Sequence, residues 1–162
     1  MEPIIKDNLA LDVIRGGLAG LVATAPMTWT MRAGERLVPN CQRGRLPPRQ
    51  ITERILGKAG VKPRLDEDER AALTTLAHYG FGASAGCLLG LVASDPRVLP
   101  RPLTGAMVGT LVWAASYVGW LPAAGIRRSA TKEPAGRNVQ LVAAHLVWGC
   151  VAGVLLDRLR ND

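Results

Sequence analysis

The chain has 162 residues, a length that suits a single domain, and a net charge of +7. Its charged side chains lie between four charge-free apolar stretches, residues 16–31, 71–94, 102–126 and 138–156. A helix of a soluble protein carries charged residues along its solvent-exposed face, and these four stretches contain no charged residue. This distribution excludes a soluble globular fold and a nucleic-acid-binding protein.

The apolar stretches have the length of membrane spans. A bilayer core about 30 Å thick needs about 20 helical residues, and three of the stretches reach or approach that length. We predict one all-α integral membrane domain over residues 1–162, with four transmembrane helices near 10–32, 70–94, 102–121 and 138–157. The first apolar stretch is too short to span a bilayer, so the predicted helix also includes residues before it, with Asp12 and Arg15 reaching toward the headgroups. No cleavable signal peptide is apparent, so we expect this span to stay as an anchor.

In chain order, the first span contains Pro26 among three threonines. Because proline leaves a backbone carbonyl without its helical hydrogen bond, we predict a kink there, with threonine hydroxyl groups bonded to the freed carbonyls. The following loop reads LPPRQITERILGKAG, and residues 46–59 place apolar and charged side chains on opposite faces of a helix. Two interpretations remain open for this amphipathic segment. It lies in the headgroup layer, or it packs as an ordinary loop helix.

Helix ends are also marked in the sequence. Asp66 is a candidate N-cap of the second span, followed by an acidic first turn, and Asn138 is a candidate cap of the fourth span. Pro122 is expected to end the third span. Trp29 and Trp120 are expected at one membrane interface as part of an aromatic belt.

The basic residues are distributed unevenly among the loops. The first and third loops, residues 32–70 and 121–137, hold fourteen of the 20 Lys and Arg residues. The positive-inside rule therefore places these loops in the cytoplasm and both termini outside. Arg127, Arg128 and Lys132 in the third loop suggest an anion site, but we interpret them as solvated positive-inside charge.

Two apolar segments form an internal repeat. LAHYGFGASAGCLLG at 76–90 and AAHLVWGCVAGVLLD at 143–157 agree at seven of fifteen positions, including the only two histidines, His78 and His145. A weaker likeness between the first and third spans predicts two hairpins related as parallel repeats. The repeat also carries glycines at four-residue spacing, which allow close backbone contact between helices in lipid. We assign a helix-packing role to Gly16, Gly20, Gly82, Gly86, Gly90, Gly105, Gly109, Gly149 and Gly153.

The two histidines are expected at the same depth, because their spans run in the same direction. Ionisable groups inside a membrane are costly and are candidates for function. Three alternatives remain open: a buried pair hydrogen-bonded to neighbouring helices, a pair that titrates or relays protons, and two axial ligands of a haem b. Partners for the first alternative are Thr24, Thr28, Ser116 and Tyr117.

No catalytic set is evident. The three cysteines, Cys41, Cys87 and Cys150, have neither a CxxC spacing nor an even number, which argues against a zinc site and a disulfide framework. The serines of the spans have no acidic partner there. We therefore expect a non-enzymatic protein that acts through helix packing as an accessory or a stress- or pH-responsive component, by self-association or in a larger complex. The alternatives are a bis-histidine haem electron-transfer module and a pathway for protons or small solutes.

Several strings resemble one family. LPPRQITERI at 46–55, AHYGFGASAG at 77–86, VWAASYVGWLPAAGI at 112–126 and AHLVWG at 144–149 are similar to the YagU-type family. That group consists of small bacterial inner-membrane proteins and is described as a domain of unknown function. The resemblance, which begins near Gly16, implies a multi-pass location in the bacterial inner membrane. It transfers no catalytic residues.

Overall fold

The computed structural model describes residues 2–36, 45–93 and 99–161, and this part of the chain is helical without strands. Four of its helices are long and apolar enough to cross a membrane, as predicted. These segments are α1 (Glu2–Glu35), α3 (Glu67–Val92), α4 (Arg101–Ala114) with its continuation through η3 (Ala115–Trp120) and α5 (Leu121–Ala123), and α6 (Ala135–Asn161). Shorter helices lie between them: α2 (Pro47–Lys58), η2 (Lys62–Arg64) and η4 (Ala130–Lys132).

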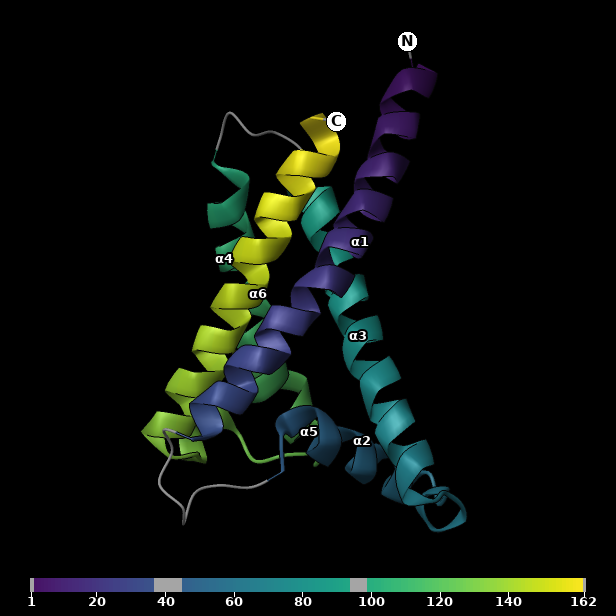
Figure 1. The fold of residues 1–162 in the computed structure, drawn as a ribbon, viewed down its shortest axis with the longest axis vertical. Helices are drawn as coiled ribbons and strands as arrows, with labels where there is room; N and C mark the ends of the chain where they lie inside the picture. Colours follow the sequence, from purple (N-terminus) through teal and green to yellow (C-terminus); the bar gives the residue numbers. More distant parts are fainter. Residues whose placement is uncertain (1, 37–44, 94–98, 162) are drawn as a thin grey trace.

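The long helices pack unequally. α1 contacts α3 extensively, α4 contacts α6 to the same extent, and α1 also contacts α6, whereas α3 barely touches α4 and α6. Figure 1 shows α3 and α6 running in one direction and α1 and α4 in the other. The two termini lie at one end of the molecule, and α2 crosses the opposite end. α3 therefore diverges from α4 and α6 toward the end that α2 occupies.

Glycines form the contact between α1 and α3. A Cβ atom added at Gly86 would lie 2.8 Å from the Cα of Gly20 and closer still to the carbonyl oxygen of Gly16. Gly82 and Gly90 face the same helix, against Gly20 and Asp12. Backbones this close gain van der Waals contact and leave no room for side chains.

The α4–α6 contact repeats this arrangement. An added Cβ at Gly149 would lie 3.0 Å from the Cα of Ala106 and would overlap the carbonyl of Gly105. Gly109 lies against the backbone of His145, and Gly153 lies against Arg101 and Pro102. All nine glycines assigned to packing thus lie at one of these two helix contacts.

Side chains, in contrast, connect α1 to α6. Trp148 donates its indole N–H to the carbonyl of Gly20 over 3.0 Å, and Gln140 donates to the carbonyl of Met31 over 2.5 Å. Leu141 and Met31 are fully buried at this contact. The indole N–H of Trp148 therefore has a partner in a place that water does not reach.

The start of α3 agrees with the prediction from the sequence, and the start of α6 differs from it. Asp66 caps α3, and its reciprocal hydrogen bonds with Glu69 form a capping box, as the acidic turn predicts. The prediction that Asn138 caps α6 is wrong. The helix begins one residue after Pro134, and Asn138 lies inside it, where its amide donates to the carbonyl of Ala130 over 2.6 Å.

Ion pairs join the helices at the end that holds the termini. Arg160, whose side chain is 7% exposed, donates to Asp12 over 2.6 Å and to the carbonyls of Gly90 and Ala93. Arg101 pairs with Asp157 nearby. The carboxylate of Asp12 therefore binds a buried guanidinium from α6, and its position relative to the headgroups stays a prediction.

Candidate functional site

A cavity of about 190 Å³ lies between α1, α3, η3 and α6 and is closed at one end by α2. Most of its lining is apolar, with Met27, Phe81 and Trp148 among the larger side chains. The polar side chains that line it are Thr24, Thr52, His78, Ser116, Tyr117 and His145. An apolar cavity with a few convergent polar groups is typical of a small-molecule site.

His78 belongs to a chain of hydrogen bonds along α1. Thr28 donates its only hydroxyl proton to the carbonyl of Thr24 over 2.7 Å, and Nε2 of His78 lies 3.1 Å from the Thr28 oxygen. Since Thr28 gives its proton to Thr24, we assign the donor in this contact to Nε2 of His78. In the neutral ring, Nδ1 of His78 then keeps a free lone pair.

His145 is fixed in the opposite tautomer. Its Nδ1 lies 2.7 Å from the carbonyl oxygen of Leu141, which can only accept, so Nδ1 carries the proton. The ring is 5% exposed and meets the ring of Tyr117 edge to face at 5.8 Å. Nε2 of a neutral His145 is therefore an acceptor, and the two histidines line one cavity with one lone pair each.

A π-helical turn positions the side of the cavity that faces His145. η3 spans residues 115–120, and its Ser116 and Tyr117 are both buried. One wide turn changes the direction of the side chains that follow it, and such turns occur often at functional sites. The sequence predicted an uninterrupted span over 102–121. The local signals of the change are Gly119 within η3 and Pro122 just after it, which has no N–H to donate to the carbonyl of Val118.

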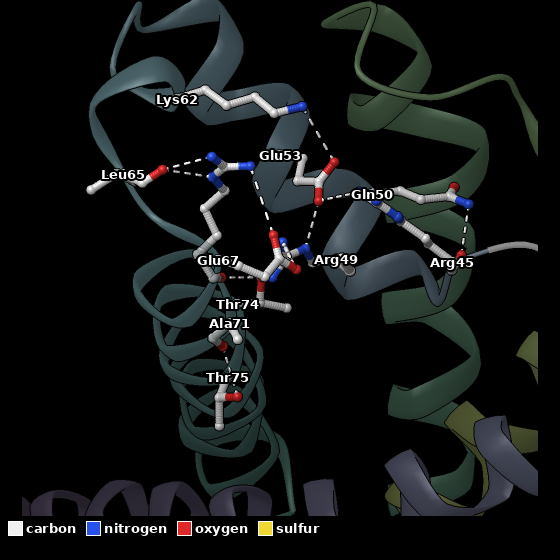
Figure 2. Close-up of polar contacts among 11 residues, drawn as sticks. Arg45, Arg49, Gln50, Glu53, Lys62, Leu65, Glu67, Ala71, Thr74 and Thr75 are labelled. Atoms are coloured by element: carbon white, nitrogen blue, oxygen red, sulfur yellow. Dashed lines mark hydrogen bonds and ion pairs between the residues drawn. The ribbon is translucent and has the colours of Figure 1, made fainter.

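The amphipathic helix α2 forms the floor of the cavity. Its apolar face, with Pro48, Ile51 and Ile55, lines the cavity, which favours the packed loop helix over a segment that only lies on a membrane surface. Figure 2 shows the polar contacts that hold the other face. Arg49 binds Glu53 over 2.6 Å and Glu67 at the start of α3 over 2.7 Å.

Glu53 is the acidic centre of that network. It accepts from Arg49 and Arg45 and pairs with Lys62 at 3.4 Å. The hydrogen bond from Arg49 is the main reason that the pKa of Glu53 is lowered, against the effect of burial. The same bond raises the pKa of Arg49.

We expect α2 to loosen in acid. A carboxyl group with a lowered pKa stabilises the fold above its unfolded-state pKa, and the stabilisation is lost as pH falls through the folded-state value. Protonation of Glu53 should therefore weaken the attachment of α2, by about 1 kcal/mol, because the outer partners Arg45 and Glu67 are exposed to solvent. Hydrogen exchange of α2 amides against pH measures this. Glu53→Gln should show the faster exchange already at neutral pH, whereas Asp68→Asn, on the exposed first turn of α3, should behave as the unmodified chain.

Arg127 holds α2 from the other side. Its side chain is only 6% exposed, and it donates to Gln50 of α2 over 2.8 Å, pairs with Glu133 at 3.6 Å and lies 5.5 Å from the centre of the Tyr117 ring. Burial lowers the pKa of Arg127 from its ordinary value. The interpretation of Arg127 as solvated charge is therefore wrong, since this guanidinium connects the third loop to α2 and η3.

The cysteines do not join the histidines. Cys87 lies against Gly17 at the α1–α3 contact, Cys150 is exposed, and Cys41 lies outside the described residues. The described residues contain no group of three metal-ligating side chains. No protein-family model, curated protein or solved structure matches the chain.

Proposed function

We propose that the chain is a non-catalytic, multi-pass membrane protein that binds a small amphiphilic molecule in the cavity between its helices. The observation that carries this proposal is that His78 and His145 line one apolar cavity, with hydrogen-bond partners that assign opposite tautomers to the two neutral rings. Each neutral ring offers a lone pair, so the polar group of the ligand is a hydrogen-bond donor such as a hydroxyl.

The volume of the cavity sets the size of the ligand. A cavity of about 150 Å³ in a protein core holds one benzene molecule, and this cavity measures about 190 Å³. It therefore suits a ring-sized group or a short stretch of acyl chain. A haem, with its four pyrrole rings, would require the helices to separate, so the size favours a small amphiphile over the haem-binding alternative.

The location follows from the charges and the resemblance. Cationic side chains gather at the α2 end of the molecule, and the strings shared with the YagU-type family point to the bacterial inner membrane. We infer that this end faces the cytoplasm and that the cavity opens within the bilayer. Binding of a ligand in the cavity would change how α2 packs against the other helices. This change in α2 is how we propose that the protein acts as a responsive or accessory component.

A matched pair of fluorescent probes tests the proposal. 1-Naphthol and 1-methoxynaphthalene have the same ring system, but only the naphthol donates a hydrogen bond. The detergent-purified chain should bind 1-naphthol about three- to tenfold more tightly, the value of one buried hydrogen bond. Quenching of tryptophan fluorescence measures both affinities.

The control removes the acceptors and keeps the apolar lining. The double variant His78→Leu with His145→Leu should bind both probes with equal affinity. Equal affinities in the unmodified chain, a preference that survives in the double variant, or no saturable binding of either probe would each contradict the proposal.

A further inference from the structure

A second, polar cleft lies on the opposite face of α2. It measures about 780 Å³, is open to the surface, and is lined in part by α2, which lies at the end of the molecule away from the termini (Figure 1). α2 contributes Gln50, Glu53, Arg54, Gly57 and Lys58 to its walls. Lys62 and the segment from Gly125 to Arg128 line the remainder, together with Glu133. A volume of this size is within the range of small-molecule sites.

The walls of this cleft have an excess of positive charge. Arg54, Lys58, Lys62, Arg127 and Arg128 face two carboxylates, Glu53 and Glu133. Both carboxylates are already paired, because Glu53 accepts from Arg49, Arg45 and Lys62, and Glu133 lies 3.6 Å from Arg127. The positive charge on the remaining side chains is thus not neutralised within the cleft.

Two arginines are available to an external anion. Arg54 on α2 and Arg128 on the third loop are exposed and have no ion-pair or hydrogen-bond partner among the described residues. Lys58 is positioned by the carbonyl of Ala124, 2.5 Å from its ammonium group, and a carbonyl does not cancel a full charge. Cationic side chains therefore lie on two walls of the cleft, one formed by α2 and the other by the third loop.

Glycines keep the space between these walls open. A Cβ at Gly57 would meet no atom within 4 Å, and Gly125 has a φ of +62°, the left-handed region that glycine tolerates. The turn at Gly125 directs the chain from the end of α5 into Arg127 and Arg128. The same glycine turn thus places Arg127 against α2 and leaves Arg128 exposed.

We propose that this cleft binds a phosphate group, with Arg54, Lys58 and Arg128 as its ligands. Guanidinium groups bind phosphate through paired hydrogen bonds, and basic clusters at the cytoplasmic end of membrane helices bind anionic headgroups. The same chemistry is offered by the headgroup of an anionic phospholipid and by a soluble phosphate ester.

The test compares two probes on the full chain in detergent: short-chain phosphatidylglycerol and inorganic phosphate. Thermal unfolding is followed while each probe is titrated. The double variant Arg54→Gln with Arg128→Gln should lower the apparent affinity at least on the order of tenfold. The matched control is Arg64→Gln with Arg158→Gln, which removes the same charge from two exposed arginines outside the cleft and should retain the affinity.

The outcomes separate the two sources of phosphate. Stabilisation by phosphatidylglycerol alone, lost in the cleft variant, identifies a lipid headgroup. An equal response to inorganic phosphate, also lost in the cleft variant, identifies a soluble phosphate. No saturable stabilisation by either probe, or the same loss in the control variant, would overturn the phosphate site. Naphthol binding in the inner cavity should be unchanged in the cleft variant, so failure of one site is distinguishable from failure of the other.

Discussion

Replacement of Gly86 with alanine should separate α1 from α3 and lower the free energy of unfolding by about 3 kcal/mol. The added methyl carbon would overlap the carbonyl of Gly16 and lie 2.8 Å from the Cα of Gly20. These atoms belong to the backbone of α1, which cannot rotate out of the way as a side chain does. The whole helix must therefore move, and the neighbouring glycine contacts weaken with it.

Gly80→Ala provides the control on the same helix. An added Cβ at Gly80 meets no atom within 4 Å, so this variant gains helix propensity without a collision and should be neutral or slightly stabilised. Unfolding in mixed micelles, followed by circular dichroism, compares the two. If both variants unfold alike, tight packing of α1 on α3 is refuted. Gly149→Ala and Gly136→Ala form the equivalent pair on α6.

Removal of the Arg160 side chain should lower the free energy of unfolding by a similar amount, about 2–4 kcal/mol. Arg160→Ala leaves the Asp12 carboxylate without its closest cation and two carbonyls at the end of α3 without a donor. Loss of one partner from a buried pair is costly because the other charge stays buried. Arg15, 4.0 Å from Asp12, compensates only in part.

The control for this prediction lies two residues away. Arg158 is exposed and has no ion-pair partner among the described residues, so Arg158→Ala should change stability by less than about 0.5 kcal/mol. The same unfolding assay measures both. An Arg160→Ala variant as stable as Arg158→Ala would show that this cluster contributes nothing to the attachment of α6.

The sequence was sufficient to predict features that depend on local patterns. The four apolar helices follow from the length and lack of charge of their segments, and the capping box follows from Asp66 and Glu69 at their three-residue spacing. The parallel directions of α3 and α6 follow from the number of spans between them. Each of these features is encoded within one segment, or in the order of segments.

Features that depend on contacts between distant segments were missed or predicted wrongly. Arg127 looked like one of several loop cations, because Gln50, its partner on α2, lies 77 positions away in the sequence. Asp12 and Arg160 are separated by 148 positions. Asn138 is a good capping residue by type, but Pro134 had already set the start of the helix, so its amide bonds Ala130 instead. The π-helical turn in η3 was missed because Gly119 and Pro122 were interpreted only as the end of the span, although Pro122 has no N–H for the carbonyl of Val118.

The unequal packing of the long helices has a consequence for biogenesis. α4 contacts α6 extensively and makes few contacts with α3, and α1 contacts the α4–α6 pair mainly through α6. If the helices insert into a bilayer during translation, α4 would therefore lack its main partner until α6 has been synthesised. A truncation that removes α6 should consequently leave α4 without its main partner and trigger quality-control proteolysis.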